Sequence, residues 1–180
     1  MAKTTGAVSR AISIIIDGRA ENVFYQIGGQ HKVRNFYNNL FAPESDLYAT
    51  IDTHAVAAAL MQPFAGTDEA VGHAFGGSPS SGITGLSGAY SIYMEVYRRA
   101  AEKYGILPRE MQSITWEAVR GLFEAADKKT LKPKINAVWD RYKRGEIDAD
   151  QARLEVISIA GGITEPSWAK TSFNDSPAIT

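Results

Sequence analysis

Apolar residues recur every three or four positions along most of the chain, the spacing of helices with one apolar face. This pattern predicts helices over residues 6–16 (capped by Thr5), 20–27, 30–41, 52–60, part of 64–75, 89–104, 108–123, 132–144 and 148–160. Glycine or proline lies at most of the predicted ends. We therefore expect an all-α fold, a single domain of about seven to nine helices over 1–162, with an irregular tail over 163–180.

Three segments refine this picture. The small apolar run Ala55–Ala59 is apolar nearly all round, which favours burial against neighbouring helices. Tyrosines at 90, 93, 97 and 104 fall mainly on one helical stripe, a pattern more typical of a core than of a base-stacking platform. Residues 76–88 hold five glycines and four serines and are expected to form a flexible loop or lid.

Composition narrows the function classes. The 180 residues contain no cysteine, which excludes disulfides, thiolate metal sites and iron–sulfur clusters. The three histidines show no metal-binding spacing, so we expect no metal and no cofactor. A net charge of −1 gives no overall attraction to nucleic acid, so any DNA binding must use a local patch.

The chain shows no segment that directs it to a membrane. Its longest early apolar run, residues 11–16, is too short for a signal peptide and is followed at once by Asp17. Nothing approaches the roughly 18 apolar residues of a membrane span. We expect a cytoplasmic protein with no membrane partner.

The candidate chemistry lies in the stretch from Gly28 to Leu60. Lys32 follows a Gly-Gly turn at the start of one predicted helix, and Asp52 begins a later one. The positive helix start and nearby cations disfavour a charged amine, and a neutral amine is the form that attacks carbonyl-like carbon. A carboxylate at a helix start is kept ionised and oriented, so it can act as a base or stabilise a developing cation.

Chain geometry allows the two residues to meet. The helix after Lys32 is roughly 15 Å long, and residues 42–51 can span up to roughly 33 Å when extended. The chain can therefore turn at Pro43 and return beside the start of the helix. The alternatives are structural: Asp52 as a simple N-cap, Lys32 as a solvated side chain, and His54 as a hydrogen-bonding group.

The segments GGQHKV and IDTHAVAAAL resemble the helix-hairpin-helix DNA glycosylase superfamily. The resemblance implies that Lys32 attacks the sugar carbon as the base departs, and that Asp52 is the catalytic aspartate. It also implies a phosphate-binding turn at Gly28, Gly29 and Gln30. His31 and Arg34, directly after the turn, are further candidate DNA contacts.

A closer resemblance is to small, mostly phage-encoded proteins that share KVRNFYNN and IDTHAV, with later segments like YRRAAEKYGILPREMQSITWEAVRGLF and AGGITEPSW. Such proteins are associated with glycosylase-like domains among DNA base-hypermodification enzymes, including thymine-derivative pyrophosphorylases. This implies DNA as the partner and the host-cell cytoplasm as the location. Near the start of the Pro108 helix, Gln112 and Trp116 would then line a pocket above Asp52 together with His54, and Trp116 would stack on a base.

The chain also departs from the glycosylase pattern. The turn before Lys32 is a residue shorter than usual and lacks its proline, and only about 30 residues precede Lys32. We therefore expect either that a second copy or a partner protein completes the cleft, or that the chain is a reduced form that binds without catalysing. The second hypothesis is a small helical phage protein that does no chemistry and binds a host or phage protein, such as an inhibitor of a defence system.

Overall fold

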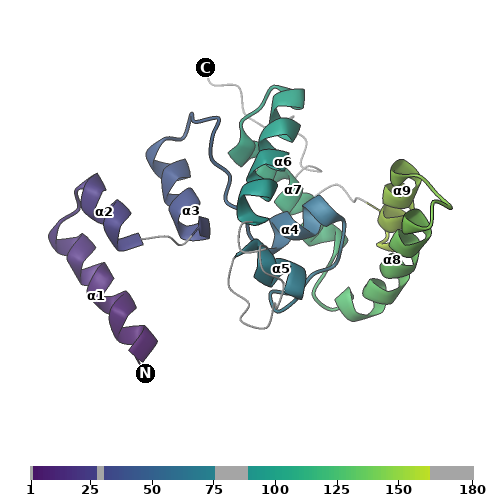
Figure 1. Cartoon of the computed structure of the whole chain (residues 1–180), viewed down its shortest axis with the longest axis horizontal. Coiled ribbons are helices and arrows are strands. Elements are labelled where there is room, and N and C mark those ends of the chain that lie inside the picture. The colour runs from purple at the N-terminus through teal and green to yellow at the C-terminus, as the bar shows by residue number, and fades with distance from the viewer. Residues whose placement is uncertain (1, 28–30, 76–88, 163–180) are drawn as a thin grey trace, which may run out of the picture.

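The computed structural model describes residues 2–27, 31–75 and 89–162, and these ranges form nine α-helices without a β-strand (Figure 1). The helices are α1 (Ala2–Ile16), α2 (Ala20–Ile27), α3 (His31–Phe41), α4 (Thr53–Leu60), α5 (Glu69–Ala74), α6 (Ala89–Tyr104), α7 (Pro108–Leu122), α8 (Lys128–Lys143) and α9 (Ala149–Ile159). The all-α class is confirmed. The predicted turn at Gly28, Gly29 and Gln30, the glycine-rich segment 76–88 and the tail 163–180 lie outside the described residues.

The helices are arranged along one long axis (Figure 1). Helices α4 to α7 form the middle, where α4 packs against α5, α6 and α7. The α1–α2 hairpin lies at one end, the α8–α9 hairpin at the other, and α3 lies between α2 and the middle. Across the described ranges, no helix is long and apolar enough to cross a bilayer.

Two hydrophobic cores meet at α4. The first joins α4, α5 and α6 with the segment before α4, and the second joins the C-terminal half of α7 with α8 and α9. Ala55 and Val56 belong to the first core, and Ala57 to the second. The predicted burial of the small apolar run is therefore confirmed for these three residues, whereas Ala59 is exposed.

Several predicted helix starts are confirmed. Asp52 caps α4, Pro108 is the first residue of α7, and Asp148 caps α9 by accepting a hydrogen bond from Gln151 N at 2.8 Å. The predicted cap at Thr5 is wrong, because α1 already begins at Ala2. A short α5 within residues 64–75 is also confirmed.

The predicted start of α8 at Lys132 is wrong, because the helix begins four residues earlier at Lys128. The carbonyl of Asp127 accepts from Thr130 N at 3.0 Å and Leu131 N at 2.9 Å, which closes a helical turn before Pro133. Pro133 therefore lies inside the helix rather than in its first turn. Pro133 suggested a helix boundary because proline lacks a backbone N–H. The turn before it forms all the same, since its hydrogen bonds are donated by Thr130 and Leu131.

Tyrosine hydroxyls of α6 hold the segment that leads into α4. Tyr90 is buried, and its hydroxyl accepts from Ile51 N at 3.0 Å and lies 3.3 Å from the carbonyl of Ala49. Tyr97 donates to the carbonyl of Ala55 at 3.0 Å. The predicted core role of the tyrosine stripe is confirmed for Tyr90 and Tyr97 but is wrong for Tyr104, which is 68% exposed at the end of α6.

We predict that Tyr90→Phe lowers the free energy of unfolding by about 1–3 kcal/mol, because it leaves the buried Ile51 N–H without its acceptor. Chemical denaturation followed by circular dichroism measures the change. Tyr104→Phe is the matched control and should stay within about 0.5 kcal/mol of the parent. Equal effects from the two variants would contradict the structural role given to Tyr90.

Candidate functional site

An open cleft of about 630 Å³ lies between α3, the segment before α4, and α7. Four of the sequence-predicted site residues line it: Lys32, Asp52, Gln112 and Trp116. The other lining residues are Phe36, Asn39, Leu40, Thr50, Arg109, Ser113 and Glu117. The fold thus brings together three segments that are distant in sequence, and both predicted catalytic residues share one cavity.

Asp52 is held by the start of α4. Its Oδ1 accepts a hydrogen bond from Ala55 N at 2.8 Å, the geometry of an N-cap. Its Oδ2 lies 3.8 Å from His54 Nδ1, and the side chain remains 18% exposed. The carboxylate is therefore fixed in direction by one oxygen and still reaches solvent, so the capping and chemical roles are compatible.

Lys32 lies in the first turn of α3 and is exposed. It lines the cleft and also a neighbouring cavity of about 300 Å³, which His31, Val33, Thr53 and Phe75 complete. Lys32 and Asp52 form no ion pair within 4.0 Å, although both belong to the described part of the chain. The amine therefore shares the cleft with the carboxylate without being neutralised by direct contact.

His31 and Arg34, the two described candidates for DNA contact next to the turn, fasten α3 to its neighbours. The His31 ring stacks on Tyr90 with centroids 5.2 Å apart. Arg34 Nη2 donates to the carbonyl of Phe24 at 2.6 Å, and the Arg34 guanidinium lies 4.8 Å from the centre of the Phe24 ring. Neither residue lines the large cleft, so their DNA contacts stay predictions.

His54 connects the carboxylate to the aromatic wall. Its ring meets Trp116 edge-on, with centroids 5.5 Å apart, while its Nδ1 faces Asp52. On Trp116, the guanidinium of Arg120 lies 5.0 Å from the ring centre. The indole therefore has two polar neighbours, one from α4 and one from its own helix.

Sequence reasoning missed the apolar wall of the cleft. Phe36 and Leu40 are 56% and 66% exposed, and they follow Lys32 at intervals of four residues on the same face of α3. Arg109 and Ser113, which also line the cleft, are likewise four residues apart on α7. The four-residue spacing is visible in the sequence and predicts that these residues share a helix face. It does not predict that this face borders a cavity.

The buried side of α3 is polar instead. Asn35 and Asn38 are its buried residues, and Asn35 Nδ2 donates to the carbonyl of His31 at 2.9 Å. Further along α3, Asn39 Nδ2 donates to Thr50 Oγ1 at 3.0 Å and ties the helix to the segment before α4. The Asn39 amide therefore attaches α3 to the segment before α4. Tyr37 and Phe41 pack edge-on against Phe24 of α2, and Phe36 and Leu40 remain for the cleft.

Two buried phenols lie in the electric field of Asp52. Burial, assisted by the negative charge of Asp52, raises the pKa of Tyr90 to about 12, although the hydrogen bonds with Ile51 N and the Asn35 side chain act in the opposite direction. Burial likewise raises the pKa of Tyr97 to about 12, with Asp52 acting in the same direction. Both hydroxyls stay protonated at neutral pH and serve as structural hydrogen-bonding groups.

Comparison with known protein families assigns the chain to one of them. A family model described as a family of unknown function (DUF7178) matches residues 2–123, so the chain belongs to this family. The match includes every residue that lines the large cleft. No curated protein and no solved structure gives a significant match. Within the described ranges, no group of three histidine or acidic side chains is arranged to hold a metal ion.

The capping and charge roles of Asp52 can be separated by substitution. We predict that Asp52→Ala lowers the free energy of unfolding by about 1 kcal/mol, because α4 loses its cap. Asp52→Asn keeps a side-chain oxygen that can accept from Ala55 N and should cost much less. Denaturation curves of the two variants measure the difference, and an equal loss in both would show that the charge, not the cap, supports α4.

Proposed function

We propose that this protein acts on DNA in the manner of the DNA glycosylase superfamily, binding an unstacked or modified base in the cleft between α3 and α7. The observation that carries the proposal is that Lys32, Asp52, Gln112 and Trp116, from three separate segments, line one open cavity. The proposal includes a helix-hairpin-helix core around α2 and α3. Its substrate class is phage-type DNA with a modified pyrimidine.

The walls of the cleft suit a flat base with a sugar-phosphate attached. Trp116 on α7 and Phe36 on α3 offer aromatic faces for stacking, and the Gln112 amide can pair with a base edge. Arg109 supplies positive charge for a phosphate. Arg109 is already fixed by donating from Nε to the carbonyl of Pro43.

The chemistry follows from the two catalytic candidates. As the bond between C1′ and the base nitrogen breaks, its electron pair leaves with the base and positive charge grows on the sugar. The oriented Asp52 carboxylate stabilises that charge. The Lys32 amine, after giving up a proton to solvent, adds to C1′ and loses a second proton. The nitrogen lone pair then forms the C=N bond as the C1′–O4′ bond breaks, and O4′ takes up a proton, which leaves the opened sugar joined to Lys32 as an imine. Without the amine attack, water would complete simple base release.

We predict that sodium borohydride traps the chain on DNA that carries an abasic site or a hydroxymethylated pyrimidine, by reducing the imine. Lys32→Gln should abolish the adduct, and Asp52→Asn should reduce its rate by about 100-fold or more. Lys129→Gln is the matched control, since Lys129 is an exposed lysine in the first turn of α8, away from the cleft. It should trap like the parent.

The assay has clear contrary outcomes. Absence of an adduct removes the imine step, and a base-release assay on the same DNA then decides whether simple N-glycosidic cleavage occurs. If neither is seen, the catalytic proposal fails. Trapping that survives Lys32→Gln would assign the nucleophile elsewhere.

Base binding is tested apart from catalysis. We predict that Trp116→Ala weakens binding to single-stranded DNA by about tenfold or more, because stacking on an aromatic side chain is worth about 1–3 kcal/mol per base. Fluorescence anisotropy with a labelled oligonucleotide measures the affinity. Trp139→Phe is the control, because the Trp139 indole donates to the carbonyl of Met61 between α8 and α4. Equal affinity of the parent and Trp116→Ala would contradict a base-stacking cleft.

A second candidate function is a helical protein that binds a protein partner and does no chemistry. It is favoured by the N-terminal end of the chain, where Ile15 and Ile16 are 82% and 81% exposed. If the parent protein neither binds DNA, nor releases a base, nor is trapped by borohydride, the results would support this candidate.

A further inference from the structure

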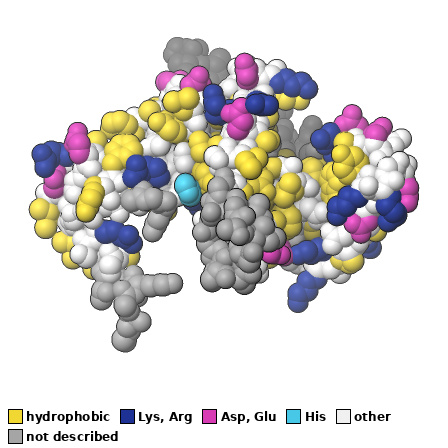
Figure 2. All heavy atoms as spheres, in the orientation of Figure 1, with side chains coloured by type: hydrophobic (Ala, Val, Ile, Leu, Met, Phe, Trp, Pro, Cys, Tyr) yellow, Lys and Arg dark blue, Asp and Glu magenta, His cyan; other side chains and the backbone are white. Residues whose placement is uncertain are grey.

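Charge alone does not select a ligand for the cleft between α3 and α7. Figure 2 shows acidic and basic side chains interspersed among the described residues of one face of the molecule, and the whole chain has a net charge of −1. Within the cleft, the carboxylates of Asp52 and Glu117 offset the positive charge of Arg109. Phosphate contacts orient a nucleic acid, whereas base contacts give selectivity. We therefore looked for selectivity among the uncharged polar groups that line the cleft.

Two uncharged polar side chains of the cleft lining are bonded to each other. Asn39 lies one helical turn beyond Phe36 on α3, and Thr50 comes two residues before Asp52. Asn39 Nδ2 donates to Thr50 Oγ1 at 3.0 Å. The hydrogen bond fixes the amide and the hydroxyl relative to each other. The pair therefore offers a base two polar groups of defined orientation.

The bond leaves one donor and one acceptor of the pair unused. A threonine hydroxyl carries one hydrogen as well as its lone pairs, and the carbonyl oxygen of asparagine can accept hydrogen bonds. Within the described part of the chain, the Thr50 hydroxyl hydrogen has no acceptor and Asn39 Oδ1 has no donor. Thr50 is only 9% exposed. A polar group so well shielded from water is destabilising until it finds a partner.

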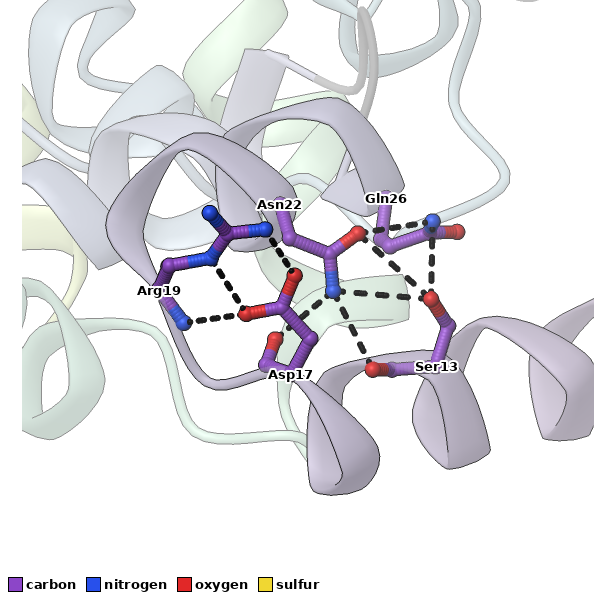
Figure 3. Close-up of polar contacts among 5 residues, drawn as sticks. All are labelled: Ser13, Asp17, Arg19, Asn22 and Gln26. Carbon is purple, nitrogen blue, oxygen red and sulfur yellow. Dashed lines mark hydrogen bonds and ion pairs between the residues drawn. The ribbon is translucent and has the colours of Figure 1, made fainter.

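The α1–α2 hairpin shows the same kinds of side chain in a closed arrangement (Figure 3). Asn22 Nδ2 donates to the carbonyl of Ser13 at 3.1 Å. The Ser13 hydroxyl accepts from Gln26 Nε2 at 3.1 Å and donates to Asn22 Oδ1 at 3.5 Å. Both functions of that hydroxyl are used inside the hairpin, as a purely structural contact requires. The Asn39–Thr50 pair differs because its donor and its acceptor stay open at a cavity.

We propose that Asn39 and Thr50 form a subsite that reads the edge of the base in the cleft. The inference rests on the proposed function, which places a pyrimidine there. Asn39 Oδ1 accepts from an N–H of the base, and the Thr50 hydroxyl donates to the acceptor atom beside that N–H. Thymine and uracil present this pair as N3–H next to a carbonyl oxygen, and cytosine presents it as the amino group next to N3.

The burial of Thr50 makes this subsite selective. A site built to hydrogen-bond a ligand rejects an analogue that lacks the bonding group, because the buried polar groups of the site are then left unpaired. A methyl group in place of the base N–H removes the donor for Asn39 Oδ1. It also keeps the neighbouring acceptor away from the Thr50 hydroxyl. Methylation of the base edge therefore separates edge reading from stacking, which it leaves intact.

Titration of the full chain, labelled with ¹⁵N, with free nucleosides tests the subsite. We predict that thymidine or deoxycytidine shifts the side-chain amide signal of Asn39 at concentrations up to about 10 mM, which detects even weak binding. The signal is identified by its loss in Asn39→Leu. The analogues methylated at the reading edge, 3-methylthymidine and N4,N4-dimethyldeoxycytidine, should bind at least about tenfold more weakly than their parents. The two pairs of ligands show which edge the subsite accepts.

Substitutions connect the discrimination with the two side chains. Thr50→Val keeps the shape of the residue and should weaken binding of the nucleoside about tenfold, because the base acceptor loses its donor. Thr50→Ser retains the hydroxyl and should bind like the parent. Asn39→Leu, followed through the backbone amides of the cleft, should bind a nucleoside and its methylated analogue almost equally. Ser13→Ala is the control from the closed hairpin contact and should discriminate like the parent.

Several results would overturn the proposal. These are equal affinity of the parent chain for a nucleoside and its methylated analogue, full affinity in Thr50→Val, and no shift with any of the four ligands. Equal weakening of both members of a pair in Thr50→Val would also overturn it, since a purely structural role has that effect. Circular dichroism checks that each variant is folded.

The titration is separate from the test of the proposed function, because free nucleosides require neither DNA binding nor chemistry. Discrimination without trapping or base release would retain the subsite and remove the catalytic proposal. Trapping without discrimination would do the reverse.

Discussion

The arrangement of the cleft depends on one buried tyrosine. Residues 49–51 are buried without a strand partner, so their backbone groups must find hydrogen bonds elsewhere. The Tyr90 hydroxyl meets Ile51 N and the carbonyl of Ala49, and its ring also receives the stacked ring of His31. One side chain thus positions the backbone that leads to Asp52 and the helix start that carries Lys32. The relation between the two candidate catalytic residues follows from this contact rather than from any bond between them.

The N-terminal helices follow a different rule from the rest of the fold. In α4 to α9, the buried apolar side chains form two cores, as helical spacing predicts. In α1 the Ser13 hydroxyl contacts α2, and in α3 the buried residues are Asn35 and Asn38, whereas Ile12, Phe36 and Leu40 are exposed. The exposed face of α3 borders the cleft to which we assign base binding.

Much of the fold could be predicted from the sequence, because helix periodicity and end signals are local. The caps at Asp52 and Asp148 and the start at Pro108 depend on neighbouring residues alone. The early start of α8 could not be predicted, since Pro133 concealed a turn built by Asp127. The apolar wall of the cleft at Phe36 could not be predicted either, because periodicity shows which residues share a helix face but not what that face borders. The grouping of the cleft residues required the tertiary contacts of α3, which no local pattern contains.

The two walls of the cleft differ in how firmly they are anchored. Helix α7 contributes Met111 to the first core and Val119 and Leu122 to the second, so it can leave its place only when both cores open. Helix α3 contributes to neither core and is attached through a ring stack and amide hydrogen bonds, including Asn39 to Thr50. Local opening therefore costs less free energy on the α3 side, and its amides should exchange with solvent deuterium well before those of α7. The α7 wall of the cleft is therefore anchored more firmly than the α3 wall, so a change in the width of the cleft would be expected to come from the α3 side.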